Sequence, residues 1–201
     1  MSLIKKGIIA SENIAIGKIK LMKKQEVKIS SEKISDDEIK LHVDKFNKAL
    51  NDYKTILSET KVDNDTQKQV IEAHLSMLDD PFLLESVISK INENFASDKA
   101  LNDTIDEMVI MMQSLDNEYM RERASDYKDI GQQLLYKIKG IENQKLDSLE
   151  PNTILVSKEL SPYETSIIDK DNVVGFLMDL GGKTAHTSII AQTLGIACLV
   201  G

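Results

Sequence analysis

Gly-Gly-Lys-Thr-Ala-His-Thr-Ser-Ile-Ile-Ala, residues 181–191, is the stretch that decides the fold of this chain. A short apolar run at residues 173–180 precedes the glycine pair, and apolar residues at helical spacing follow it. This order predicts a buried strand, a flexible turn and a helix over residues 184–194 that carries His186 in its first turn. Such a unit belongs to a sheet that is covered by helices.

The same stretch favours the binding of a phosphoryl group. Gly181 and Gly182 allow the backbone to approach a ligand closely, and the N–H groups and dipole of a helix start attract an anion. His186 supplies a nucleophile, because one nitrogen of a neutral imidazole can attack phosphorus while the other is held by a hydrogen bond. We therefore predict that His186 is catalytic. The residues predicted to support the phosphate site are Gly181, Gly182, Lys183 and Thr184.

Short strand patterns occur near both ends of the chain. Near the carboxyl end they lie at residues 153–156, 173–178 and 197–200. They alternate with helix patterns, one of which starts at Ser161-Pro162, and this order predicts a mixed sheet covered by helices. Two further strands, residues 7–10 and 14–22, have no other sheet to join, so we expect them to pair into the same sheet.

Between these two parts the pattern is helical. A capping box at residues 35–38 opens a long helix to about residue 58, and a second helix ends before Pro81. A third helix follows, and residues 100–141 form a fourth helical region that is divided near Asp116-Asn117. Each segment has one apolar stripe that must be buried in a bundle. We predict an α/β domain of residues 1–22 and 146–201, with an all-α helical bundle of residues 23–145 inserted into it.

Composition and charge exclude several classes of protein. The chain has 201 residues, 41% of them hydrophobic and 29% charged, which is typical of a globular protein. Its net charge of −8 argues against a nucleic-acid partner. No stretch has the length of a membrane span or the apolar core of a signal peptide. We therefore expect a cytoplasmic protein without membrane insertion, in which the single cysteine, Cys198, is a buried free thiol.

Several motifs together resemble enzyme I of the bacterial phosphoenolpyruvate-dependent sugar phosphotransferase system. The glycine pair, the Thr-x-His core and the Ser-Ile-Ile-Ala that follows look like its phosphohistidine site. Residues 7–17, 72–80 and 119–131 also resemble the family, so the likeness covers nearly the whole chain. The implied fold is an α/β swivelling phosphohistidine domain with an inserted helical domain that binds the phosphocarrier protein HPr.

The resemblance also implies roles for individual residues. His186 would accept phosphate from phosphoenolpyruvate and pass it to a histidine of HPr, and Thr165 would hydrogen-bond the imidazole and fix its tautomer. An acidic face suits a basic partner, because residues 35–95 contain 13 Asp or Glu against 7 Lys or Arg. The positions at or beside the family's HPr contacts are Asp65, His74, Met77, Asp80, Arg123 and Lys128.

The chain departs from the family pattern close to the histidine. Gln192 replaces the usual Arg six residues after it, which removes a positive charge that could steady a transferring phosphoryl group. Lys183 compensates for this in part, and Ala185 replaces the common Ser before the histidine. These departures bear on the efficiency of phosphotransfer and not on the fold.

The family continues into a carboxy-terminal barrel that binds phosphoenolpyruvate with magnesium and forms a homodimer. The resemblance therefore implies that this chain is an amino-terminal fragment without a metal or cofactor of its own. Such a fragment should not autophosphorylate from phosphoenolpyruvate.

Two alternatives to a phosphoryl relay stay open at this point. A binding module could dock a phosphocarrier without transferring phosphate, and the swivelling domain of a dikinase carries a similar Gly-Gly-x-Thr-x-His core. The other two histidines lack such a motif. We interpret His42 as a solvated or satisfied helix histidine and give His74 at most a role in docking.

Overall fold

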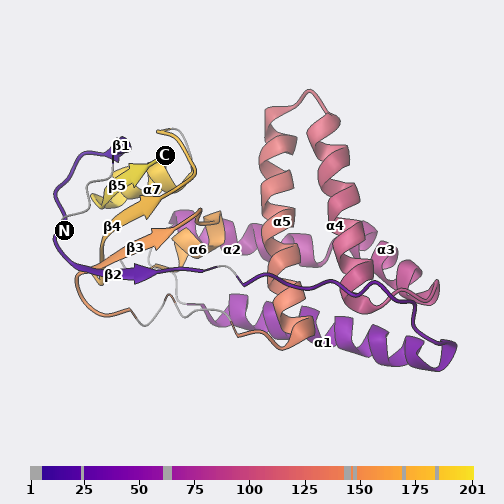
Figure 1. Ribbon diagram of the computed structural model, residues 1–201. Helices are drawn as coiled ribbons and strands as arrows, with labels where there is room; N and C mark the ends of the chain where they lie inside the picture. The colour runs from indigo at the N-terminus through magenta and orange to yellow at the C-terminus, as the bar shows by residue number, and fades with distance from the viewer. Residues whose placement is uncertain are drawn as a thin grey trace. The chain divides into compact units, whose positions relative to one another are not determined.

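The computed structural model describes residues 6–23, 25–60, 65–142, 146, 149–168, 171–183 and 186–201. The chain forms two compact units (Figure 1). One unit comprises Met1–Gln25 and Gln144–Gly201, and the other comprises Glu26–Asn143. The helical segment therefore interrupts the α/β segment in the sequence, and the predicted fold class is confirmed.

A mixed five-stranded sheet forms the first unit. Its strands are β1 (Ile8–Ser11), β2 (Lys18–Leu21), β3 (Thr153–Ser157), β4 (Val173–Met178) and β5 (Ala197–Val200). They lie in the order β1-β5-β4-β3-β2, with β1 antiparallel to β5 and the other pairs parallel. The two strands from the beginning of the chain thus pair into the carboxy-terminal sheet, as predicted, but at its opposite edges.

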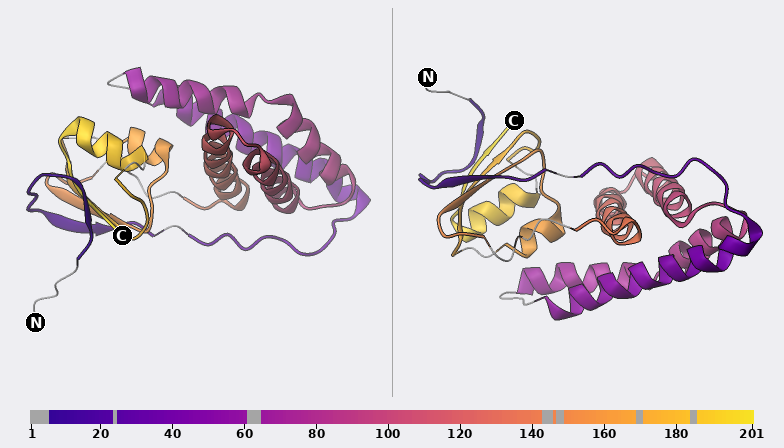
Figure 2. Two further views of the ribbon diagram at one scale, coloured as in Figure 1. Left: turned by 90° about the horizontal axis from the view of Figure 1, so that it is seen from above. Right: turned by 60° about the horizontal axis from the view of Figure 1, so that its bottom comes forward.

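One face of this sheet is covered by α6 (Pro162–Ser166) and α7 (His186–Leu194), as Figures 1 and 2 show. The strands alternate, and the residues on the covered face join Ala191 of α7 in a buried core. Those residues include Leu155, Phe176, Met178, Cys198 and Val200. The thiol of Cys198 is therefore buried, as predicted, and burial raises its pKa while a hydrogen bond with Ser188 opposes that rise.

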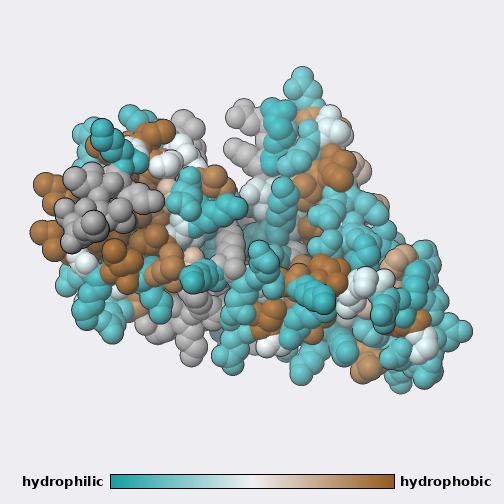
Figure 3. Space-filling model, viewed as in Figure 1, coloured by the Kyte–Doolittle hydropathy of each residue, from teal (hydrophilic) through white to brown (hydrophobic). Residues whose placement is uncertain are grey.

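The strands at the edges of the sheet expose apolar side chains. Ile19 of β2 pairs with Ile154 of β3 and is 71% exposed, and Ile9 of β1 is 55% exposed. Ile14 and Ile16 in the segment between β1 and β2 are almost fully exposed. Figure 3 shows this apolar surface on the α/β unit around β1 and β2.

Helices form most of the described part of the second unit, after an extended segment at its start. They are a 3-10 turn (Asp36–Glu38), α1 (Ile39–Glu59), α2 (Asp65–Leu78), α3 (Pro81–Asn92), α4 (Ser97–Ser114) and α5 (Glu118–Lys139). Each of the helices α1 to α5 buries one apolar stripe, as the spacing predicts. The largest fully buried side chains, which form the centre of the bundle, include Phe46, Tyr53, Leu83, Met108 and Leu134.

Local capping residues set the helix ends where the sequence places them. The carboxylate of Asp80 accepts a hydrogen bond from the backbone N–H of Phe82, so Asp80 caps α3 and Pro81 is the first residue of this helix. Asn117 caps α5 in the same way and divides the fourth helical region. Gly140 ends α5 in the left-handed conformation, with φ of 65°.

Buried polar groups hold the start of α4. The Nδ1 atom of His42 accepts the backbone N–H of Ser97 at 3.0 Å, so His42 is a satisfied histidine. Asp98 is 2% exposed, and its carboxylate accepts from the Lys139 ammonium at 2.6 Å and from the backbone N–H of Ser30 at 2.7 Å. Burial favours the neutral acid, but these donors prevail and hold the pKa of Asp98 below its ordinary value.

Within the part of the chain that the structure describes, no helix is both long enough and apolar enough to cross a membrane.

Candidate functional site

The predicted phosphate site lies where β4 leads into α7. Helix α7 begins at His186, so this residue occupies the first turn as predicted. Gly181 has a φ of 113°, which favours glycine over any residue with a side chain. The side chain of Lys183 is exposed beside this turn. Thr184, Ala185 and the side chain of His186 lie outside what the structure describes.

Ser188, the second residue after His186, holds the glycine turn in place. Its side chain is fully buried, and its hydroxyl donates to the carbonyl of Gly182 at 2.7 Å. The turn is therefore attached to the first turn of α7 by a side chain as well as by the backbone. Sequence reasoning missed this role, although the position of Ser188 beside the histidine was the available signal.

Thr165 lies in α6, which packs beside α7. A complete capping box starts this helix, because Ser161 and Glu164 exchange side-chain to backbone hydrogen bonds of 3.0 and 2.8 Å. Thr165 is 1% exposed, and its hydroxyl donates to the carbonyl of Ser161 at 2.8 Å. Its Oγ1 atom lies 3.3 Å from Oγ1 of Thr187, the residue that follows His186. The structure thus places Thr165 against the start of α7.

Gln192 makes a structural contact in place of the family arginine. Strand β1 has an irregular register between Ile9 and Ser11. The Gln192 Nε2 atom donates to the carbonyl of the intervening Ala10 at 2.6 Å. The amide of Gln192 therefore attaches α7 to the edge strand β1. This structural role is separate from the charge that the family arginine would supply at the same position.

We expect Gln192→Leu to destabilise the attachment of β1 by about 1 kcal/mol, because a partly buried carbonyl loses its donor. Hydrogen exchange of the β1 amides should accelerate correspondingly. A Gln192→Arg variant keeps a donor at this position and should exchange like the parent chain. Equal exchange in the Leu variant would show that this bond contributes nothing to the stability of β1.

The helical unit brings three of the six predicted docking residues together, namely Asp80, Arg123 and His74. Asp80 accepts from the Tyr127 hydroxyl, which ties the α2–α3 junction to α5. Burial is the largest influence on the pKa of Tyr127, which it raises, and on the pKa of His74, which it lowers. The positive charge of Arg123 lowers the pKa of both groups. The Arg123 Nε atom also donates to the hydroxyl of the exposed Tyr119 at 3.0 Å. This junction is where α2, α3 and α5 meet.

Two predicted docking residues are buried instead of exposed. His74 is 1% exposed and Met77 is 3% exposed, because both lie on the face of α2 that packs into the bundle. The Tyr53 hydroxyl lies 3.4 Å from Nδ1 of His74. Neither side chain offers a surface to a partner, so any influence on docking acts through the position of α2.

The remaining two docking residues are exposed but lie elsewhere. Asp65 is the first residue of α2. It lies nine positions before His74 on this helix, which corresponds to a rise of ~13 Å along the helix axis. Lys128 is exposed on α5.

The helical unit also exposes large apolar side chains, among them Phe82, Leu115 and Tyr119. Sequence reasoning missed the tyrosines of this region, which the spacing of Tyr119, Arg123 and Tyr127 on one helix face could have indicated.

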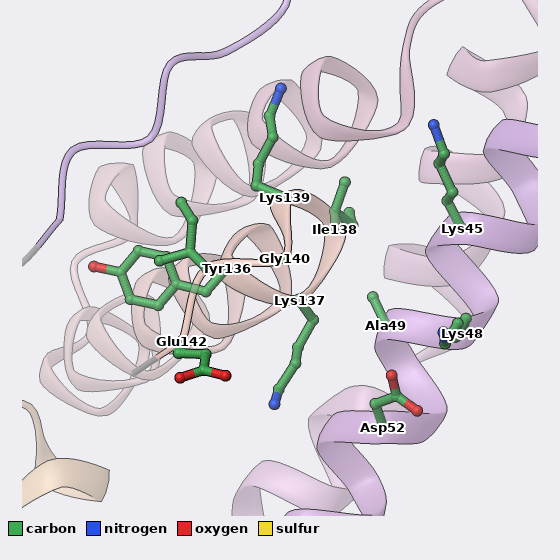
Figure 4. A pocket seen from close by; sticks show the side chains of 11 residues that line it. Lys45, Lys48, Ala49, Asp52, Tyr136, Lys137, Ile138, Lys139, Gly140 and Glu142 are labelled. Atoms are coloured by element: carbon green, nitrogen blue, oxygen red, sulfur yellow. The ribbon is translucent and has the colours of Figure 1, made fainter. Parts of the chain in front are cut away.

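A separate hollow occurs on the helical unit between α1 and the end of α5 (Figure 4). Lys45 and Lys48 line it from α1, and Lys137 and Lys139 line it from α5. Their ammonium groups do not converge, since Lys139 and Lys45 point away from Lys137 in Figure 4. Lys139 is also paired with Asp98. The hollow contains none of the predicted site residues.

No group of three or more His, Cys, Asp or Glu side chains is placed to hold a metal ion among the described residues.

Two family descriptions match this chain. The family described as PEP-utilising enzyme, N-terminal, matches residues 6–123, and the family described as PEP-utilising enzyme, mobile domain, matches residues 149–201. Both α/β segments and most of the helical unit therefore fall within matched regions. The second match includes the glycine turn and His186.

Curated relatives named phosphoenolpyruvate-protein phosphotransferase match along nearly the whole chain. The relative from Staphylococcus carnosus is 34% identical over 98% of this chain, and that from Buchnera aphidicola is 37% identical over 97%. The chain spans 35% of the length of each relative.

Solved structures agree with these matches. A solution structure of Enzyme I (nEIt) superposes with a TM-score of 0.88 at 34% identity, covering 98% of this chain and 82% of that one. The N-terminal domain of Enzyme 1 – Nitrogen superposes with a TM-score of 0.64, and its 18% identity supports the fold alone.

Proposed function

Because this chain belongs to the PEP-utilising enzymes and its resemblance to the amino-terminal domain of enzyme I is confirmed, we propose that it is a station in a phosphoryl relay. In this relay His186 accepts a phosphoryl group that originates from phosphoenolpyruvate and passes it to the histidine of the phosphocarrier HPr. The activity is that of a phosphoenolpyruvate-protein phosphotransferase of the sugar phosphotransferase system.

The observation that carries this proposal is the start of α7. Helix α7 begins at His186, a few residues after the glycine pair, and the backbone N–H groups of a first helical turn have no partners within the helix. These groups and the helix dipole can stabilise the charge of a phosphoryl group during transfer. Thr165 lies close enough to this turn for its hydroxyl to contact Thr187, which supports its proposed bond to the imidazole.

HPr is the proposed partner, and the α2–α3–α5 junction is its proposed docking region. Asp80 supplies a negative charge there, and Tyr119 and Phe82 supply exposed apolar and aromatic area. A basic, partly apolar partner would find both kinds of contact on one surface. Asp65 and Lys128 could extend this surface, whereas His74 and Met77 would support it from below.

The longer relatives provide the context for the remaining parts of this proposal. Phosphoenolpyruvate would bind to a barrel domain outside this chain, with magnesium as its cofactor and a homodimer as the assembly. We also propose a cytoplasmic location, since a relay to a phosphocarrier needs free diffusion between proteins.

Incubation of this chain with phosphorylated HPr tests the proposal without the barrel. In each transfer the N–P bond of HPr breaks, its nitrogen keeps the electron pair, and a new N–P bond forms to the nitrogen of His186. We expect one phosphoryl group per chain. HPr that binds at low salt without transferring a phosphoryl group would instead favour the docking module.

A further inference from the structure

We propose that Tyr127 is a positioning residue for the docking of the phosphocarrier, because it holds the carboxylate of Asp80 at the α2–α3–α5 junction. The inference deepens the proposed function and rests on it. Tyr127 lies on α5 and is 6% exposed. Its hydroxyl donates to the Oδ2 atom of Asp80, which lies 47 positions earlier in the sequence.

The two carboxylate oxygens of Asp80 accept from different elements. Oδ1 accepts the backbone N–H of Phe82 at 2.9 Å and so caps α3, while Oδ2 accepts the Tyr127 hydroxyl from α5. The torsion that turns an aspartate carboxylate is soft, so a cap bond to one oxygen leaves the plane of the group free to rotate. The second bond, from Tyr127, fixes that plane.

Both donors orient the carboxylate without neutralising it, since a backbone amide and a phenol are uncharged. The neighbouring Asp79 differs, because the ammonium of Lys54 pairs with its carboxylate and offsets its charge. Burial first, and the bond to Asp80 second, raise the pKa of Tyr127 above its ordinary value, so the phenol keeps its proton and remains a donor. The junction therefore presents an oriented negative charge at Asp80.

This charge lies beside exposed apolar and aromatic area. Tyr127 is almost fully buried, whereas Phe82, whose N–H Asp80 accepts, is 55% exposed. A basic and partly apolar partner that contacts Phe82 would therefore also meet the carboxylate of Asp80. Charge-assisted hydrogen bonds depend on distance and direction, so a carboxylate that is free to rotate would bind a cationic side chain less well.

The test measures the binding of HPr to the parent chain, to Tyr127→Phe, to Asp80→Asn and to the variant that carries both changes. Tyr127→Phe keeps the buried ring and removes only the hydroxyl. We expect it to raise the Kd for HPr ~3–10-fold, and to have no further effect once Asp80→Asn has removed the charge. In transfer from phosphorylated HPr, Tyr127→Phe should raise KM by a similar factor and leave kcat within about twofold of the parent.

Tyr136→Phe is the matched control. Tyr136 lies on the same helix and is also 6% exposed, but it lines the hollow between α1 and the end of α5. Its variant should bind HPr like the parent. The carbon-13 chemical shift of the Asp80 carboxyl group reports the bond directly, and it should change in Tyr127→Phe and not in Tyr136→Phe.

Two results would overturn the inference and leave the proposed function in place. One is a Tyr127→Phe variant that binds HPr as tightly as the parent. The other is an equal loss of affinity in the Asp80→Asn background, because the hydroxyl would then act on the bundle and not through Asp80. If the parent chain does not bind HPr, the proposed function fails instead, and the carbon-13 comparison alone then decides whether Tyr127 positions Asp80.

Discussion

A His186→Ala variant is expected to take up the phosphoryl group from phosphorylated HPr at least ~10³-fold more slowly than the parent chain. The imidazole is the proposed nucleophile, and alanine offers no atom that can form the N–P bond. The glycine turn and the helix start would remain, since their contacts come from Ser188 and from the backbone. Initial rates of radiolabel uptake measure the difference.

The control for this variant is His42→Gln. The chain has three histidines, of which His74 is buried and His42 accepts a backbone N–H through Nδ1. The Gln variant should therefore be labelled like the parent. A phosphohistidine is labile in acid and stable in base, which distinguishes it from a phosphoester. Equal labelling of the His186→Ala variant would remove His186 from the relay.

Much of the fold could be predicted because local chemistry determines the element boundaries. Pro81 lacks an N–H and ends α2, Asn117 caps α5, and Gly140 adopts the left-handed conformation that terminates it. The glycine turn before His186 is similarly local. Each of these signals spans only a few residues, so the sequence alone displays them.

Long-range contacts could not be predicted in the same way. The bond from Gln192 to Ala10 joins residues 182 positions apart, and it depends on an irregularity in β1 that no local pattern indicates. The sequence therefore suggested a lost charge where the structure has an attachment. The bond from Thr187 to Leu160 is of the same kind, since only the packing of α6 on α7 brings the two together.

The docking residues show a different limit of sequence reasoning. His74 lies in residues 72–80, which resemble the enzyme I family, and this resemblance suggested at most a role in docking. Ile71, His74 and Leu78 recur at helical spacing, however, and all three are buried in the bundle. The apolar stripe of α2 thus determined the position of His74 more strongly than its polarity did.

Burial of His74 leads to the second large effect, a loss of stability in mild acid. Burial first, and the charge of Arg123 second, lower the pKa of His74 from 6.5 to about 4. The unfolded chain therefore binds a proton below pH 6.5 that the folded chain does not bind until near pH 4. Stability is fully present above pH 6.5 and falls as the pH drops through this window, by ~3 kcal/mol in total.

Urea unfolding followed by circular dichroism measures this effect, because α1–α5 supply most of the helical signal. The free energy of unfolding should fall between pH 6.5 and 4 in the parent chain and fall much less in His74→Gln, whose amide does not titrate. His42→Gln serves as the matched control, since burial lowers the pKa of His42 as well but less completely. Asp98 loses most of its contribution below its ordinary pKa of 3.8, so it acts mainly outside this window. If His74→Gln lost as much stability as the parent across this range, another group would have to be the one that titrates, and the buried imidazole would have no part in the acid sensitivity of the bundle.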